Sequence, residues 1–255
     1  MFSLKDKLAI ITGGGSGIGR AVARVFARQE AIVHVLDINR DAAATVAREI
    51  NDHGGHAAAH RCDVTSQQEV LGLFNSIGSV DALVNSAGVS HIGTVENTTE
   101  EDFDRVFSVN VKGVYNCLHA AVPIMRKKGG GAIVNLCSVA AWTGLPDRFA
   151  YSMSKGAVGA MTLAVARDTV QDHIRCNSIS PGRVHTPFVD DFLARNYPGR
   201  EKEIYDKLAK TQPVGRMGTP EEIATLVLFL CSDEADFITG TDYPIDGGFI
   251  KLNTP

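Results

Sequence analysis

The sequence lacks a basic excess, long apolar runs and a high charge density, and each absence excludes a class of protein. Its 25 Lys and Arg residues face 29 Asp and Glu residues, which gives a formal net charge of −4. Without a Lys/Arg cluster to neutralise phosphates, general nucleic-acid binding is excluded. The longest apolar runs, such as residues 226–231, are far shorter than the ~20 residues that span a bilayer. With 44% hydrophobic and 21% charged residues, the chain has the composition of a globular protein rather than a disordered one.

Targeting, disulfide and metal-binding patterns are also missing. Residues 1–7 hold no apolar segment of signal-peptide length, so we expect a cytoplasmic protein. The five cysteines are widely spaced without a Cys-x-x-Cys pair, and we interpret them as small buried hydrophobic residues in a reducing compartment. They are Cys62, Cys117, Cys137, Cys176 and Cys231. The eight histidines contain no His-Glu-x-x-His motif, so we expect chemistry without a metal.

Short apolar runs alternate with segments of helical periodicity from one end of the chain to the other. The apolar runs predict strands at 8–12, 32–37, 57–62, 82–85, 132–137, 174–179 and 243–246. The periodic segments predict helices at 17–28, 41–53, 66–76, 100–127, 151–170 and 220–231. Strand–helix alternation implies right-handed βαβ units. We therefore expect one α/β domain over residues 1–255, a doubly wound parallel sheet of about seven strands with helices on both faces.

Two of the predicted helices carry local signals. Thr219 precedes Pro220 and two acidic residues, which is typical of a helix N-terminus. The long helix 100–127 is expected to place one stripe on a single side, from Phe103 through Phe107 and Asn110 to Met125. Pro123 is expected to kink or end this helix.

A glycine-rich loop, Thr12-Gly13-Gly14-Gly15-Ser16-Gly17-Ile18-Gly19, joins the first predicted strand to the first predicted helix. Glycines allow a sharp turn and a close approach to a pyrophosphate, while the helix N-terminus offers free N–H groups and a positive dipole end. A glycine-rich loop alone is weak evidence. Placed between a strand and a helix, it predicts the dinucleotide-binding loop of a Rossmann fold.

The end of the second predicted strand indicates which dinucleotide is bound. Asp37 lies 18 residues beyond Gly19, where an acid can accept both ribose hydroxyls of NAD. Its charge would repel a 2′-phosphate, and the adjacent Ile38 supplies no compensating charge. Arg40, however, is close enough to reach such a phosphate. The alternative role for Asp37 is that it only caps the next turn and binds no ribose. NAD is the expected cofactor.

Three side chains form a candidate catalytic set. Tyr151 and Lys155 are four residues apart in a predicted helix and share a face, although this spacing alone often occurs by chance. Ser138 follows a predicted strand, at the sheet edge where open α/β sheets bind ligands. A free tyrosine side chain has a pKa near ~10, too high for a base at neutral pH. Because a nearby ammonium stabilises a phenolate, the set predicts proton transfer with an oxygen that the serine hydroxyl can hydrogen-bond.

The order of these motifs resembles that of the short-chain dehydrogenase/reductase family. The matching segments cover nearly the whole chain and are residues 12–19, Asp63-Val64, Asn85-Ser86-Ala87-Gly88, Asn110, Ser138, Tyr151-x-x-x-Lys155, Pro181-Gly182 and Asp246-Gly247-Gly248. Ser86 departs from the pattern, since the family more often has a second Asn at this position. The departure leaves Asn85, Ala87 and Gly88 in place.

The resemblance implies a role for each matching residue. Tyr151 takes the proton of a substrate hydroxyl as hydride leaves for the nicotinamide C4, Lys155 holds the nicotinamide ribose, and Ser138 positions the substrate oxygen. Asn110 anchors a water between Lys155 and solvent. The alternative is that its side chain only interrupts the helix by hydrogen bonding. The other implied cofactor contacts are Gly13, Ser16, Gly17, Ile18 and Gly19 in the loop, Asp63 and Val64 beside the adenine, Asn85, Ala87 and Gly88 on the adenosine ribose side, and Pro181, Val184 and Thr186 near the carboxamide.

Two arginines lie near the expected hydride-transfer site. Arg148 is three residues before Tyr151, and Arg183 follows Pro181-Gly182. A guanidinium binds a carboxylate through two parallel hydrogen bonds, so the pair suggests an acidic substrate. Surface ion pairs with Asp147 or Asp190 are the alternative. Family members that oxidise small hydroxy acids, such as the cytosolic 3-hydroxybutyrate type, resemble this chain in having an arginine at position 148.

The C-terminal half resembles the bacterial 2-keto-3-deoxy-L-fuconate dehydrogenases within the family, in residues 183–189, 196–199, 211–217, 231–234 and 248–253. Those enzymes use NAD to oxidise a secondary hydroxyl of a deoxy sugar acid in non-phosphorylated fucose or rhamnose breakdown. The resemblance implies this substrate class, with oxidation at C4 as the more specific expectation. Further substrate-pocket candidates, each with plain packing or a solvated loop position as the alternative, are Ser90, His91, Trp142, His185 and Phe188.

Other functions and the assembly follow from the same residues. The alternatives are an L-fucose dehydrogenase, a 3-hydroxybutyrate-type dehydrogenase, or a dinucleotide sensor without turnover. The sensor is disfavoured because the complete Ser–Tyr–Lys set is present. Residues 185–215 are expected to form the substrate loop. We expect a homotetramer, because the apolar stripe and the tail around Phe249-Ile250 leave apolar surface and the family pairs its long helices between subunits. The expected partner is a small acidic sugar, and no nucleic-acid or membrane partner is expected.

Overall fold

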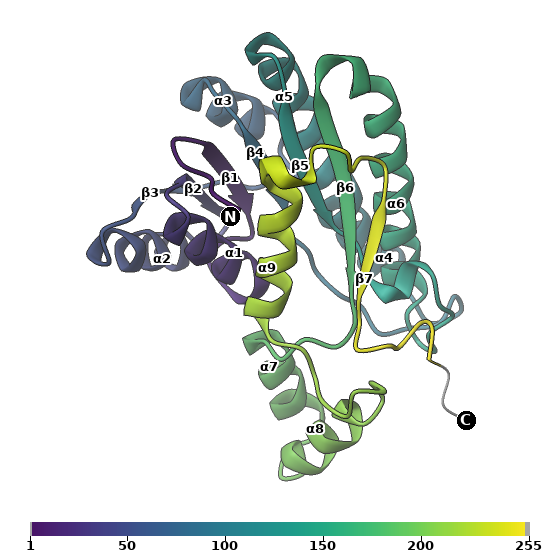
Figure 1. The fold of residues 1–255 in the computed structure, drawn as a ribbon. Coiled ribbons are helices and arrows are strands. Elements are labelled where there is room, and N and C mark those ends of the chain that lie inside the picture. The colour runs from purple at the N-terminus through teal and green to yellow at the C-terminus, as the bar shows by residue number, and fades with distance from the viewer. Residues whose placement is uncertain (1, 253–255) are drawn as a thin grey trace.

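A parallel sheet in the order β3-β2-β1-β4-β5-β6-β7 forms the centre of the computed structural model (Figure 1). The structure describes residues 2–252, apart from the side chains of Phe188 and Asn196. Its strands are β1 (Leu8–Thr12), β2 (Ile32–Asp37), β3 (His56–Arg61), β4 (Ala82–Asn85), β5 (Gly131–Leu136), β6 (Ile174–Pro181) and β7 (Asp242–Ile245). The predicted strands agree within one residue, except that β6 continues to Pro181. The predicted doubly wound α/β fold is confirmed.

Helices cover both faces of the sheet because successive strand residues point to opposite sides. The helices are α1 (Gly17–Arg28), α2 (Arg40–Asp52), α3 (Gln67–Ile77), α4 (Glu100–Phe107), α5 (Gly113–Lys128), α6 (Phe149–Thr169), α7 (Pro187–Asn196), α8 (Glu201–Ala209) and α9 (Pro220–Cys231). In β1, Ile11 packs into the apolar cluster formed with α1, α2 and α9. The preceding Ile10 packs into the opposite cluster with α3, α5 and α6. None of the described helices is both long and apolar enough to cross a membrane.

The N-terminus of α9 is fixed by reciprocal hydrogen bonds. The Thr219 hydroxyl accepts from the N–H of Glu222 at 3.2 Å, and the Glu222 carboxylate accepts from the N–H of Thr219 at 2.8 Å. Pro220 occupies the first turn, where no N–H partner is needed. The helix start predicted at Thr219 is confirmed.

The segment predicted as one long helix is divided by a π-helical turn, Ser108–Lys112, between α4 and α5. The wider turn changes the helical phase, so Asn110 is buried whereas Phe107 is 42% exposed. The expected continuous stripe from Phe103 to Met125 is therefore wrong at Phe107. The helix continues through Pro123 to Lys128 and ends at Gly129, whose φ of 97° is left-handed.

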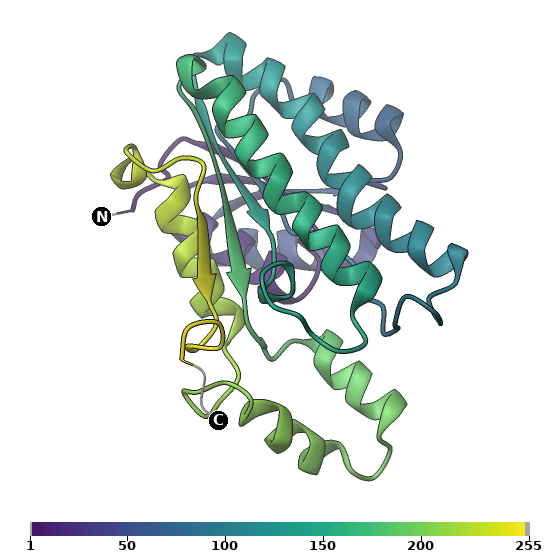
Figure 2. The same cartoon turned by 90° about the vertical axis from the view of Figure 1, so that its right-hand side faces the viewer.

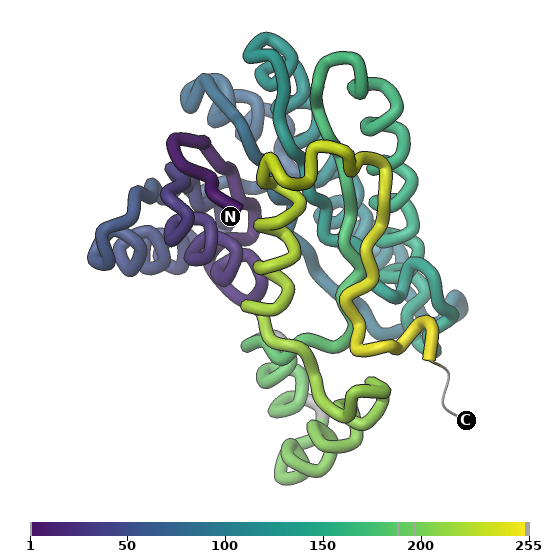
Figure 3. Tube along the Cα trace, in the orientation of Figure 1, coloured from purple at the N-terminus to yellow at the C-terminus, as the bar shows by residue number. Residues whose placement is uncertain are grey.

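Two helices stand where the sequence predicted a loop. α7 and α8 project beyond the C-terminal ends of the strands, as the two views at right angles show (Figures 1 and 2). The chain after α8 returns beside the segment that follows β7, where the N–H of Val214 donates to the carbonyl of Gly247 at 3.2 Å (Figure 3). The pair thus forms one wall of the edge at which a parallel sheet binds ligands.

Candidate active site

A cleft of about 860 Å³ lies along the C-terminal edge of the sheet. Following the strand order, it extends from Asp37 at the end of β2, past the glycine loop after β1, to Ser138 after β5 and Arg183 after β6. At this edge the chain leaves each strand for the next helix, so side chains distant in sequence meet there.

The glycine loop forms a close-packed cradle at one side of the cleft. Gly13 and Gly17 have φ values of 63° and 51°, which favour glycine. A Cβ atom on Gly13 would lie 2.8 Å from Cα of Ala87, and one on Gly19 would lie 2.2 Å from the carbonyl oxygen of Gly13. The Ser16 side chain makes no capping hydrogen bond, which leaves the N–H groups of the first turn of α1 available. This arrangement fits a pyrophosphate at a helix N-terminus.

Asp37 is held at the β2 end of the cleft by two backbone donors. Its Oδ2 accepts from the N–H of Gly15 at 3.0 Å, and its Oδ1 accepts from the N–H of Asn39 at 2.9 Å. Arg40, which begins α2, is exposed and does not line the cleft. The carboxylate is thus fixed beside the loop where a ribose would lie.

The structure brings together all but one of the residues predicted to bind the cofactor. Those that line the cleft are Gly13, Ser16, Gly17, Ile18, Gly19, Asp37, Asp63, Val64, Ala87, Gly88, Tyr151, Lys155, Pro181, Val184 and Thr186. Asn85 is the exception. Its side chain is buried within the sheet, where Nδ2 donates to Oδ1 of Asn135 on β5 at 2.8 Å. Because the amide joins β4 to β5, Asn85 does not line the cleft, and its contact with a cofactor stays a prediction.

The candidate catalytic side chains Ser138, Tyr151 and Lys155 line the same part of the cleft. The Ser138 hydroxyl accepts from the N–H of Ala140 at 3.1 Å, which orients it at the start of the loop after β5. Lys155 is 6% exposed, and its Nζ donates to the carbonyl oxygen of Leu136 at 2.7 Å. The same Nζ lies 5.8 Å from the centroid of the Tyr151 ring. An ammonium held by one carbonyl in a low-dielectric site can stabilise negative charge on the neighbouring phenol oxygen.

Asn110 lies behind this set, in the π-helical turn. Its Oδ1 accepts from the N–H of Val89 at 2.8 Å, and its Nδ2 donates to the Val89 carbonyl at 2.9 Å and to the Ser154 hydroxyl at 3.0 Å. The amide therefore ties the segment after β4 to the residue before Lys155. This favours the alternative in which Asn110 interrupts its helix through side-chain hydrogen bonds, and the water-anchoring role stays a prediction.

Two cations face the substrate end of the cleft. The Arg148 guanidinium donates to the Ser90 hydroxyl at 3.4 Å and to the His91 carbonyl at 3.3 Å. Burial and the nearby Arg148 both lower the pKa of Arg183 below its ordinary value. Asp190, the acid considered as a partner from the sequence, instead contacts His185. Among the described side chains, neither guanidinium has a carboxylate partner. This leaves uncompensated positive charge beside the candidate catalytic set.

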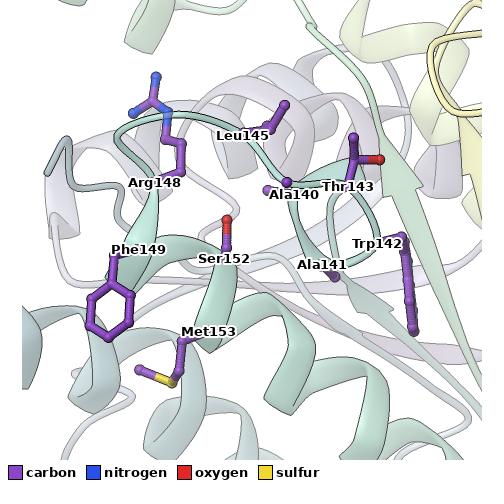
Figure 4. Close-up of a pocket in the computed structure, with 10 residues that line it drawn as sticks. Ala140, Ala141, Trp142, Thr143, Leu145, Arg148, Phe149, Ser152 and Met153 are labelled. Atoms are coloured by element: carbon purple, nitrogen blue, oxygen red, sulfur yellow. The ribbon is translucent and has the colours of Figure 1, made fainter. Parts of the chain in front are cut away.

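Two of the other predicted substrate contacts lie outside this cleft. Trp142 borders a neighbouring open hollow of about 480 Å³, where its indole lies across the loop from Arg148 (Figure 4). His185 is exposed, and its ring packs edge-on against Tyr205 with centroids 5.0 Å apart. Each is held by a protein partner, Ser180 or Tyr205, and contact with a substrate stays a prediction for both. Ser90 and His91 do line the cleft, and the side chain of Phe188 is outside the described part of the chain.

The cleft also contains residues that the sequence analysis missed. Val189 and Phe192 of α7 and Leu208 of α8 line its outer wall, with Gln212 and Phe249. The signal for α7 was present, since Thr186 and Pro187 repeat the pattern of a cap residue followed by proline that begins α9. Phe249, in the tail expected to make subunit contacts, also lines the cleft, and the subunit contact stays a prediction.

A nicotinamide-dinucleotide-binding oxidoreductase is the class of protein that this fold and cleft define. The sequence profile of the family described as "Enoyl-(Acyl carrier protein) reductase" matches residues 13–250. The chain is 37% identical over 247 residues to a 2-keto-3-deoxy-L-fuconate dehydrogenase of Xanthomonas campestris pv. campestris, covering 96% of this chain and 81% of the relative.

Solved structures of nicotinamide-dependent oxidoreductases are similar to this chain over nearly its whole length. L-sorbose reductase from Gluconobacter frateurii, complexed with NADPH and L-sorbose, superposes with a TM-score of 0.94 at 30% identity over 99% of both chains. A 7α-hydroxysteroid dehydrogenase complexed with NADH superposes with a TM-score of 0.89 at 37% identity, covering 97% of this chain and 95% of the other. The chain belongs to the short-chain dehydrogenase/reductase family. It is an oxidoreductase that acts on hydroxyl groups with a nicotinamide dinucleotide.

Proposed function

We propose that this enzyme uses NAD to oxidise a secondary hydroxyl of a deoxy sugar acid, with 2-keto-3-deoxy-L-fuconate oxidised at C4 as the specific substrate in non-phosphorylated fucose or rhamnose breakdown. The observation that carries the substrate class is the pair Arg148 and Arg183, which face one cleft without a carboxylate partner among the described side chains. Half-buried like charges are costly unless a counter-ion reaches them, so a carboxylate ligand compensates the pair. The similarity to the Xanthomonas enzyme supports the same substrate.

The proposed reaction moves one proton and one hydride. Tyr151, as the phenolate, takes the proton of the substrate hydroxyl while the carbon that bears it loses hydride and becomes a ketone. When bound, the nicotinamide ring supplies the hydride acceptor at its C4. Ser138 donates a hydrogen bond to the reacting oxygen, and Lys155 holds the nicotinamide ribose and stabilises the phenolate.

The preference for NAD rests on Asp37. Its fixed carboxylate accepts hydrogen bonds from ribose hydroxyls and repels a 2′-phosphate. Arg40 is exposed and outside the cleft wall, which supports its exclusion from phosphate recognition. The remaining lining residues would hold the pyrophosphate on the glycine loop and the adenine against Asp63 and Val64.

The test is NADH formation at mildly alkaline pH with 2-keto-3-deoxy-L-fuconate, L-fucose and 3-hydroxybutyrate side by side. The proposal expects the keto-deoxy acid to have the highest kcat/KM. Arg148→Ala should then raise its KM while the Kd of NADH is unchanged, because a bidentate hydrogen-bonded ion pair is lost. A preference for L-fucose would overturn the assignment of an acidic substrate.

We also propose a cytoplasmic homotetramer. Apolar side chains remain exposed on α4, α5 and α6, on the outer side of the sheet, and are Phe107, Tyr115, Phe149 and Leu163. Exposed apolar side chains on these neighbouring helices support subunit contacts. A monomer mass in light scattering at micromolar concentration would refute the assembly.

A further inference from the structure

Arg183 is held by Thr211 and Gln212, which lie two and three residues beyond the end of α8. Its Nε donates to the hydroxyl of Thr211 at 3.0 Å, and its backbone N–H donates to Oε1 of Gln212 at 3.2 Å. These partners are 28 and 29 positions away in the sequence, on the far side of the α7–α8 pair. The orientation of the arginine therefore depends on where α8 ends.

The hydrogen bonds around Thr211 form a complete set. Its hydroxyl accepts from Arg183 and from Nε2 of Gln212 at 3.0 Å, and it donates to the carbonyl oxygen of Leu208 at 2.7 Å. A hydroxyl has one proton and two lone pairs, so its bonding capacity is filled. Gln212 is 2% exposed, and a Cβ on Gly182 would lie 2.4 Å from its Oε1. Gly182 thus leaves the space that the glutamine side chain occupies.

This arrangement leaves the two terminal nitrogens of the Arg183 guanidinium available to a ligand. Nε is used by Thr211, and no protein partner is found for either terminal nitrogen of Arg183 in the part of the chain that the structure describes. Two terminal N–H groups present the geometry that binds a carboxylate bidentately. The nearby Arg148 repels Arg183, so without an anchor the Arg183 side chain would turn toward solvent.

We propose that Thr211 and Gln212 are positioning residues that aim Arg183 at an anionic substrate group and thereby set the selectivity for acids over neutral sugars. The inference rests on the proposed acidic substrate. It adds that the segment at the C-terminal end of the α7–α8 pair contributes to selectivity by orienting Arg183. Removal of the Thr211 hydroxyl should release Arg183 even though its charge is retained.

The experiment compares Thr211→Val, Thr211→Ser and Arg183→Ala with the double variant Thr211→Val/Arg183→Ala. For each, kcat/KM is measured with 2-keto-3-deoxy-L-fuconate and with L-fucose. Thr211→Val should raise KM for the acid about tenfold, with little change in kcat or in the constants for L-fucose. Thr211→Ser retains the hydroxyl and should restore the acid preference. On the Arg183→Ala background, Thr211→Val should have no further effect on the acid-to-neutral ratio.

A control variant and the possible negative results distinguish the positioning role of Thr211 from the proposed acidic substrate. Thr225→Val removes a comparable hydroxyl from the exposed face of α9 and should change no constant. If the wild type prefers the acid and a folded Thr211→Val enzyme keeps this preference, the positioning role alone is overturned. An equal loss of kcat/KM for the acid and for the neutral sugar in Thr211→Val would overturn it as well. If Thr211→Val does not fold, failure of Thr211→Ser to retain the preference decides against the role. A wild-type enzyme that prefers L-fucose would overturn the proposed function as well.

Discussion

The indole Nε1 of Trp142 donates a hydrogen bond to the hydroxyl of Ser180 at 2.9 Å. This bond connects the loop that begins at Ser138 to β6, just before Arg183. Ser180 in turn donates to Oδ1 of Asp242 on β7 at 2.9 Å. Trp142 therefore anchors the loop that carries Arg148 at its other end.

Trp142→Phe tests this anchor, because it removes the N–H and retains an aromatic ring. We expect the free energy of unfolding to fall by about 1 kcal/mol and kcat/KM to decrease as the loop loosens. Thermal unfolding and steady-state kinetics measure the two effects. Ser180→Ala should produce a similar loss, and the double variant should be less than additive. If the hydrogen bond does not anchor the loop, Trp142→Phe will leave the free energy of unfolding unchanged.

Tyr151→Phe should reduce kcat by a factor of about a hundred or more, because a positioned acid–base group contributes a factor of this order. The substitution removes only the ionisable oxygen, so the Kd of NADH, followed by fluorescence, should remain as in the wild type. Tyr115→Phe, at an exposed position of α5, is the matched control and should be fully active. Normal turnover in Tyr151→Phe would remove the residue from the catalytic set.

Asp37→Ser should change the choice of cofactor. Loss of the carboxylate removes the acceptor for the ribose hydroxyls and the repulsion of a 2′-phosphate. The ratio of kcat/KM for NAD to that for NADP should fall by about tenfold or more, the equivalent of one good charged hydrogen bond. Asp41→Ser, a nearby acid of α2 that does not line the cleft, should leave the ratio unchanged. A wild-type enzyme that already prefers NADP would contradict the role of Asp37.

His34 and His60 should make the stability dependent on pH. Nδ1 of His34 and Nε2 of His60 are 2.9 Å apart between β2 and β3. Burial, and then the charge of His60, lower the pKa of His34 from 6.5 to about 4. Between these values the unfolded chain binds more protons than the folded one. Stability should therefore be complete above pH 6.5 and should decline as the pH falls toward 4.

The size of this effect is limited by the partial exposure of the two rings. We expect a loss on the order of 1 kcal/mol for His34 between pH 7 and 4 after solvent screening is considered. Urea unfolding at several pH values measures it, and His34→Gln should flatten the curve because an amide does not titrate. His53→Gln, at an exposed turn, is the control. Identical pH dependence in wild type and His34→Gln would show that the pair is not the cause.

Local sequence determined most of the fold and part of the cleft. The strands and the capped start of α9 depend on periodicity and capping within a few residues, which are visible without tertiary contacts. The glycine loop and Asp37 were identified for the same reason, since their chemistry depends on their position relative to one strand and one helix. The Tyr151–Lys155 pair needed only the helical repeat.

Tertiary contacts decided the local structure around Asn110 and the partners of Trp142 and Arg183, which periodicity cannot predict. The π-helical turn around Asn110 depends on hydrogen bonds to Val89 and Ser154, 21 and 44 positions away. The role of Trp142 depends on Ser180, and the orientation of Arg183 depends on Thr211. In each case the partner of the polar group comes from a segment that is distant in the sequence and packs nearby. The sequence alone therefore supplied the chemical groups of the site, whereas the packing of distant segments decided which of them face the substrate.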